Sequence, residues 1–307
     1  MQSQDSVRTI IIALVANVVI AIAKLISGIS SGSTALIAEA AHSFADSSNE
    51  VLLGISLRRA MKPPDDKHPL GHGRERFLWA FMAAMASFLI GGCFSIAIAI
   101  RELAHDGGTK RTLAAWIVLG IAFLADGFSW VQSVRQARDE ARERGRSVSA
   151  HLLRSSDPIV RAIVVEDSAA LIGLVIAAAG LLVSQMTHSG RPDAIASLLI
   201  GVLMAITAFG LARPLADFLV GRSLPKLYLD KIRSVIESDR AVEEILSLQA
   251  VYTGPEEVVV AAKVRPVSEL TGEQLAKAMD DLDATLHRES PFVADVYIDV
   301  SSHHATR

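Results

Sequence analysis

The chain has 307 residues, of which 51% are hydrophobic and 21% charged, and its formal net charge is -3. Its mean hydropathy of +0.38 is too high for an ordinary soluble domain, and the apolar residues come in blocks rather than on alternating faces. The single cysteine, Cys93, excludes an intramolecular disulfide framework and a cysteine-based zinc cluster. These values predict an α-helical membrane protein.

Six apolar segments are long enough to cross a bilayer, because a hydrocarbon core of ~30 Å needs about 20 helical residues. They are residues 7–29, 34–57, 77–101, 112–133, 158–185 and 193–220. The first has no separate cleavable signal before it, so we interpret it as a retained helix. Six spans place both termini on the same side of the membrane.

Basic residues mark that side. They are dense between the second and third spans, from Arg58 to Arg76, and between the fourth and fifth spans, where six arginines lie from Arg135 to Arg154. By the positive-inside rule these connections and both termini are cytoplasmic. The arginine run is then a topology signal, and no nucleic-acid partner is expected. Without a transit peptide in the sequence, we expect a multi-pass protein of the cell membrane.

After Gly221 the pattern changes to that of a small cytoplasmic α+β domain. A helical pattern over 225–239 precedes two alternating runs, 246–252 and 258–264, and a second helical pattern over 275–286 precedes a last alternating run, 296–300. The order αββαβ predicts a ferredoxin-like domain of residues 222–307 after a transmembrane domain of residues 1–221. So small a core is marginal alone, and pairing with a second copy would steady it.

The second span carries His42 and Asp46, four residues apart and therefore on one helical face. They lie roughly 13 and 20 Å below the outer end of the span, near the middle of the bilayer. An ionisable residue at that depth indicates a functional site, although buried polar groups can also simply join helices. Glu50 continues the stripe, either as the lining of an inward cavity or at a solvated helix end.

The fifth span carries Glu166 and Asp167, about 12 to 14 Å in from the cytoplasm and thus near the same level. One imidazole nitrogen from His42 and carboxylate oxygens from Asp46 and Asp167 would make an open site suited to zinc or a similar divalent ion. Glu166 is turned by about 100° from Asp167 and faces either a neighbouring helix or a proton path. For Asp126, in the fourth span, a structural charge pair is the first interpretation and a relay role the second.

A second group of candidate ligands lies in the connection after the second span. Asp65, His68 and His72 are close enough in sequence to bind one ion, and the proline and glycines around them set the turns.

These runs resemble the cation diffusion facilitator family of divalent-metal transporters. The resemblance rests on residues 38–46 (AEAAHSFAD) and 65–74 (DDKHPLGHGR), followed by the short cytoplasmic domain, and it covers essentially the whole chain. It implies a homodimer in the lipid bilayer that exports zinc or a related ion from the cytoplasm in exchange for protons. It also implies that His42, Asp46 and Asp167 are transport-site ligands and that Asp65, His68 and His72 form a lesser site. The metal is then cargo, and no resident cofactor is expected.

The sequence departs from many relatives at one position of this site. Ile163 stands four residues before Asp167, where they have His or Asp, and the pattern VVEDSAA is instead similar to the zinc transporter 9 branch. The fourth ligand and the choice of metal stay open. The last strand lacks histidine, and His303 and His304 follow it, so the cytoplasmic domain is expected to serve dimerisation more than metal sensing.

Three other classes of function can be compared with the sequence. A membrane metallohydrolase would need a run such as H-E-x-x-H, which does not occur, so we do not expect an enzyme. A non-transporting metal-binding scaffold or sensor acting through the cytoplasmic domain is the main alternative, and a carrier for another solute is a third. For the transporter, zinc needs neutral imidazole and ionised carboxylates, so metal and protons compete for the same groups.

Overall fold

The computed structural model describes residues 2–105, 113–143, 147–148, 158–255 and 257–301, with side chains for 14–104, 113–142, 147–148, 162–255 and 257–301. Part of the Arg135–Arg154 run, and His303 and His304, lie outside the described residues. The chain divides into two compact units, one formed by Met1–Ser56 and Leu78–Leu215 and the other by Leu57–Phe77 and Ala216–Arg307.

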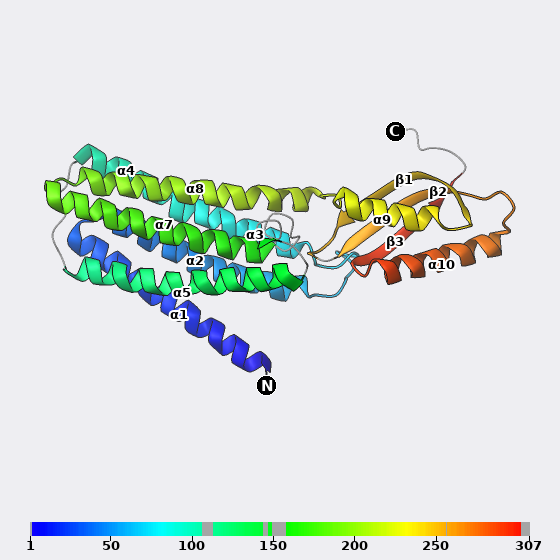
Figure 1. Cartoon of the computed structure of the whole chain (residues 1–307), viewed down its shortest axis with the longest axis horizontal. Coiled ribbons are helices and arrows are strands. Elements are labelled where there is room, and N and C mark those ends of the chain that lie inside the picture. The colour runs from blue at the N-terminus through cyan, green and yellow to red at the C-terminus, as the bar shows by residue number, and fades with distance from the viewer. Residues whose placement is uncertain (1, 106–112, 144–146, 149–157, 256, 302–307) are drawn as a thin grey trace. The chain divides into compact units, whose positions relative to one another are not determined.

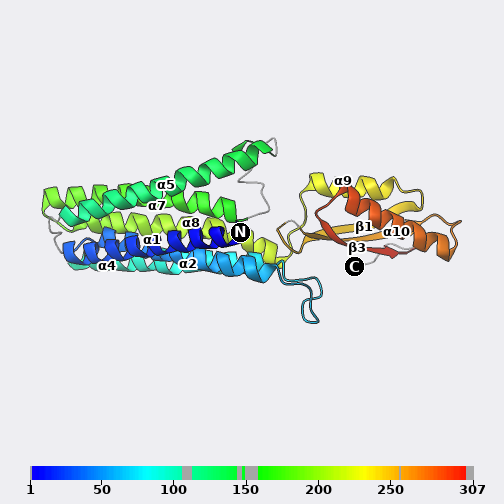
Figure 2. The same cartoon turned by 90° about the horizontal axis from the view of Figure 1, so that it is seen from below.

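The first unit is a bundle of long helices that run side by side (Figures 1 and 2). Its helices are α1 (Gln2–Ser31), α2 (Thr34–Ala60), α3 (Glu75–Ala86), α4 (Phe94–His105), α5 (Leu113–Glu143), α7 (Pro158–Thr187) and α8 (Arg191–Val220). A π-helical segment, η1 (Ser87–Cys93), joins α3 to α4 without a break. Buried alanines of α2 and α5, among them Ala38 and Ala122, let the helices approach closely.

Large apolar side chains cover the outside of the bundle. Ile26 of α1 is 63% exposed, and Leu124 and Phe128 of α5 are each 74% exposed. Surfaces of this kind are stable against lipid rather than water. Within the described residues, five helical segments are long and apolar enough to cross a membrane: Leu14–Ser31, Glu75–Ala104, Leu113–Arg142, Ala162–Thr187 and Arg191–Val220.

Helix α2 forms where the second span was predicted but is not among these five segments. Polar side chains reduce its hydropathy, and they are packed inside the bundle, where Glu39 is 0% and His42 2% exposed. Intramembrane ionisable residues face a bundle interior in this way. The count of six spans therefore stays a proposal, with α2 as the sixth.

The first turn of α2 is held by the first turn of α8. The Asp193 carboxylate accepts hydrogen bonds from Ser33 Oγ (2.7 Å), Thr34 Oγ1 (3.0 Å) and the Ala35 amide (3.1 Å). It thus satisfies a backbone donor that the helix itself leaves unpaired. This contact fixes where α2 begins.

The second unit contains α9 (Lys226–Glu237), β1 (Val242–Tyr252), β2 (Val258–Pro266), α10 (Gly272–Glu289) and β3 (Val293–Val300). The predicted order of helix, strand, strand, helix and strand is confirmed. The sheet has the order β1-β2-β3, with β1 and β2 antiparallel and β2 and β3 parallel, so α10 is the crossover. Alternate β2 residues, Val258, Val260, Ala262 and Val264, are at most 3% exposed in its core. A ferredoxin-like fold stays a prediction.

The connection Leu57–Phe77 belongs to this second unit. Arg74 Nε donates to the Tyr252 carbonyl at 3.3 Å, and the Phe77 ring stacks on Phe218 with centroids 4.6 Å apart. A Cβ at Gly73 would lie only 2.5 Å from the Thr253 carbonyl oxygen, so only glycine allows this approach. The loop that carries the second group of candidate ligands is therefore anchored to β1 and its turn.

Candidate metal centre

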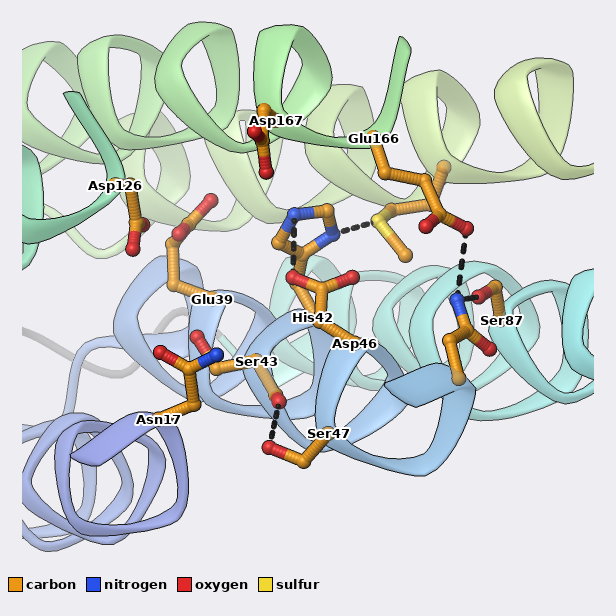
Figure 3. A network of polar contacts seen from close by, with 12 residues as sticks. Asn17, Glu39, His42, Ser43, Asp46, Ser47, Ser87, Asp126, Glu166 and Asp167 are labelled. Carbon is orange, nitrogen blue, oxygen red and sulfur yellow. Dashed lines mark hydrogen bonds and ion pairs between the residues drawn. The ribbon is translucent and has the colours of Figure 1, made fainter. Parts of the chain in front are cut away.

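The centre of the bundle holds His42 and Asp46 as a pair. His42 Nε2 lies 3.3 Å from Asp46 Oδ2, and the two side chains are 3% and 29% exposed. The spacing of four residues places both on one face of α2, as predicted, and Figure 3 shows them between α2 and α7.

The orientation of the His42 ring decides what this pair can bind. Nδ1 contacts the Met204 sulfur of α8, and a thioether can only accept a hydrogen bond. Neither His42 Nε2 nor Asp46 Oδ1 has a hydrogen-bond partner among the described residues. An imidazole nitrogen and a carboxylate oxygen at this distance can share a proton or, when the imidazole is neutral at Nε2, hold a cation between them.

Asp167 projects from α7 at the level of this pair (Figure 3). Its Oδ2 accepts hydrogen bonds from Ser133 Oγ at 2.9 Å and Ser129 Oγ at 3.2 Å, both on α5. The structure thus places Asp167 on α7, facing the His42–Asp46 pair, but the three predicted ligands do not meet. Among the described residues, no group that includes His42 has three ligand atoms within 4.8 Å of one another.

Glu166 is hydrogen-bonded to α2. Asn49 Nδ2 of α2 donates to Glu166 Oε1 and to Ser87 Oγ of η1, both at 2.7 Å (Figure 3). Of the two interpretations from sequence, the contact with neighbouring helices is the one the geometry supports. Glu50, further along α2, accepts a hydrogen bond from Asn17 Nδ2 of α1 at 2.7 Å.

Sequence reasoning missed two ionisable residues beside this centre, Lys24 and Glu39. Both side chains are 0% exposed, and Lys24 Nζ lies 3.3 Å from Glu39 Oε2 and 3.5 Å from Asp126 Oδ2. The charge pair interpreted for Asp126 is therefore present. A lysine inside an apolar span is itself a signal for function, and the rule that identified His42 could have found it.

The loop group in the second unit comes together as predicted. Ligand atoms of Asp65, His68 and His72 all lie within 4.8 Å of one another, with His72 Nε2 at 3.0 Å from Asp65 Oδ2 and His68 Nδ1 at 3.1 Å from Asp65 Oδ1. Gly71 turns the chain between them at φ 78°, which favours glycine. His72 Nδ1 lies 2.9 Å from Glu75 Oε1, which orients the ring.

Electrostatics in this loop favour an imidazolium. Hydrogen bonds to Glu75 and Asp65 raise the pKa of His72 above its ordinary value. Hydrogen bonds from His72 and from the backbone of His68 hold the pKa of Asp65 well below its ordinary range. A metal ion at this group would displace the proton that His72 shares with Asp65.

The sequence also matches a described family over most of its length. Residues 10–220 match the cation efflux transmembrane domain. The chain belongs to the cation efflux family. The resemblance to the cation diffusion facilitators and to their zinc transporter 9 branch is thereby confirmed, as is a multi-pass membrane protein.

The names of similar proteins mention different metals. The chain is 29% identical over 252 residues to metal tolerance protein C4 of Arabidopsis thaliana, covering 82% of this chain and 55% of that one. It is 27% identical over 257 residues to the mitochondrial proton-coupled zinc antiporter SLC30A9 of Xenopus laevis, covering 84% and 46%. It is 24% identical over 249 residues to the manganese efflux system protein MneP of Bacillus subtilis, covering 81% and 80%. The chain spans about half the length of the first two relatives.

Proposed function

We propose that this chain exports a divalent metal cation, zinc above all, from the cytoplasm in exchange for protons through a site centred on His42 and Asp46. The observation that carries the proposal is the pair of His42 Nε2 and Asp46 Oδ2, 3.3 Å apart inside an apolar helix bundle, with the imidazole buried and the carboxylate partly exposed. Asp167 on the facing helix supplies a third ligand, and Glu166 belongs to the polar wall of the same path. The similarity to a protein named as a zinc antiporter and to one named as a manganese efflux protein supports metal export.

The chemistry of the ligands provides the coupling. Zinc requires neutral imidazole and ionised carboxylates, so protons that enter from one side displace the metal that entered from the other. Asp167 must leave its serine partners, or move with α5, to close on the same ion as Asp46. Alternation is then a rocking of helices around the site, in which no covalent bond is made or broken, so we propose a transporter and not an enzyme.

The arrangement in the cell is part of the same proposal. Six spans with both termini in the cytoplasm follow from the basic connections. The small α+β unit, residues 222–307, would pair with a second copy to form a homodimer. The membrane we propose is the cell membrane, and immunolocalisation of the tagged full chain tests it against the mitochondrial location in the name of the Xenopus relative.

One observation favours the alternative of a non-transporting metal-binding scaffold or sensor. The loop group Asp65, His68 and His72 belongs to the same compact unit as the sheet, so a bound ion there would act on that unit directly. This alternative predicts metal binding without metal movement.

Reconstitution of the full chain separates the two. Proteoliposomes carrying a zinc dye and a pH dye would be compared for the native chain, Asp46→Asn and the control Ser48→Ala. Among the described residues, the Ser48 hydroxyl bonds only to the Phe44 carbonyl of its own helix. We expect zinc flux with opposite proton flux in the native and control proteins and neither in Asp46→Asn. Native protein that binds zinc without moving it would overturn the proposal in favour of the scaffold.

A further inference from the structure

Lys24 is a fully buried cation beside a site proposed for a divalent cation. Its Nζ lies 3.3 Å from Glu39 Oε2 and 3.5 Å from Asp126 Oδ2, and it donates to Ser43 Oγ at 2.8 Å. Ser43 directly follows His42 in the chain. Figure 3 shows Glu39 and Asp126 on the same side of His42. The ammonium group therefore contacts α2, which carries the His42–Asp46 pair, and α5, whose serines donate hydrogen bonds to Asp167.

Its acidic partner Glu39 is fixed in place by the packing of α7. A Cβ at Gly173 would lie 2.3 Å from Glu39 Oε1, so the carboxylate occupies space that only glycine leaves. That oxygen has no hydrogen-bond partner among the described residues. Glu39 is thus held between Lys24 and α7, with one of its two oxygens unpaired.

Electrostatics make this position costly for the proposed cargo. Like charges repel strongly where water is excluded, so an ammonium bonded to Ser43, the residue after His42, weakens the binding of any cation to the His42–Asp46 pair. Hydrophobic residues of similar volume could join α1, α2 and α5 without that effect, and often with greater stability. Transport requires an intermediate affinity for the metal, because the ion must bind well enough to enter and weakly enough to leave.

We propose that Lys24 is a built-in counter-cation that lowers the affinity of the His42–Asp46 site for divalent metal and so sets how readily the metal is released. Glu39 and Asp126 hold the ammonium in place and moderate its charge. Lys24 is a positioning and tuning residue that does not touch the metal. This inference rests on the proposed transport function of that site.

Equilibrium zinc binding to the purified full chain tests it. Every protein compared would carry His68→Ala, so that the loop group does not contribute. Lys24→Met removes the charge and keeps the length, and we expect it to tighten zinc binding about tenfold and to slow flux in proteoliposomes. Lys24→Arg keeps the charge and should bind zinc as the native residue does, and Lys226→Met, at an exposed position of α9, is the control. Unchanged or weaker zinc binding in Lys24→Met would overturn the inference, because a merely structural lysine gives that result together with reduced thermal stability.

A second arm applies if Lys24→Met does not fold, since it leaves two buried carboxylates without their cation. Glu39→Gln leaves the charge of Lys24 less compensated, and we expect about tenfold weaker zinc binding. The double variant Lys24→Met/Glu39→Gln carries neither charge and should return close to the native affinity. A double variant that stays as weak as Glu39→Gln would mean that Glu39 itself holds the metal, and would overturn the inference.

The same data distinguish failure of the inference from failure of the proposed function. If Asp46→Asn binds zinc as tightly as the native chain, the transport site itself is wrong. If Asp46→Asn loses binding while Lys24→Met does not gain it, only the role of Lys24 is wrong.

Discussion

The two candidate metal centres of this chain are built in opposite ways. The loop group Asp65, His68 and His72 is local, anchored by glycines and already brought together. The bundle centre takes His42 and Asp46 from α2 and depends on α7 and α5 to present Asp167, which is held by serines instead. The difference teaches that a site closed by facing helices can open and release its ion through helix movement, whereas a loop site is suited to retention.

The largest effect is expected from the ligands of the bundle. His42→Ala should reduce zinc flux about 100-fold or more, because the proposed site loses its imidazole and Asp46 loses its facing partner. Dye-loaded proteoliposomes measure the flux. If His42→Ala transports at the native rate, the contrast between a transport centre and a loop centre no longer holds.

A smaller effect is expected from the packing that supports this centre. Gly173→Ala places a methyl group where Glu39 Oε1 lies, so we expect about tenfold lower flux and a loss of stability of about 1–3 kcal/mol. Gly210→Ala on α8 is the matched control, since a Cβ there meets nothing within 4 Å. Thermal unfolding and flux of the two variants should differ; equal behaviour would show that the position of Glu39 does not matter.

At the loop centre we expect zinc binding to depend strongly on pH and its loss to change zinc flux only slightly. His72→Ala is expected to remove zinc binding at the loop while flux falls by no more than a few-fold. In the native chain, protonated His72 is stabilised by Glu75 and Asp65; that stabilisation is full below the ordinary pKa of about 6.5 and is lost as the pH rises through the raised pKa. Zinc binding follows the opposite sign and should strengthen about tenfold per pH unit up to the pKa of His72.

Calorimetric titration of the Asp46→Asn chain, which retains the loop group, would measure this dependence between pH 5 and pH 8. Zinc affinity that is constant over that range would contradict the assignment of His72 as a ligand.

The smallest effect is expected where neither centre is touched. Thr271 caps α10 through a reciprocal pair of hydrogen bonds with Gln274, so Thr271→Ala should destabilise the second unit by about 1 kcal/mol and leave flux unchanged. Thr285→Ala on the same helix should cost less, because this hydroxyl caps no helix end: it donates to the Asp281 carbonyl and accepts from Arg288 Nη2 at an exposed position. Chemical denaturation of the full chain followed by far-UV circular dichroism compares the two.

Local patterns carried most of what could be predicted. The spacing of His42 and Asp46 and the alternation of Val258, Val260, Ala262 and Val264 depend on single elements, and the structure places those residues as expected. The family followed from two short runs, one in α2 and one in the connection after it.

Contacts between distant segments could not be predicted. The pairing of Lys24 with Glu39 and Asp126 joins three helices, and the bond of Asn49 to Glu166 joins residues 117 positions apart. The segment Leu57–Phe77 meets the rest of the second unit through contacts such as the ring stacking of Phe77 and Phe218 and the bond of Arg74 to the Tyr252 carbonyl. Such contacts are set by how elements pack, and a single sequence without alignment gives no signal for them.

The carboxylate of Asp193 anchors the N-terminal end of α2 to α8, so α2 can tilt about that end. Three hydrogen bonds hold its first turn to α8, so sliding along the axis would break all of them, whereas tilting about that end would not. A tilt of about 10° displaces Asp46, about 18 Å along the helix, by about 3 Å. Metal–ligand bonds tolerate deviations of only about 0.2 Å, so a small swing of one anchored rod is enough to make or to dissolve a coordination sphere.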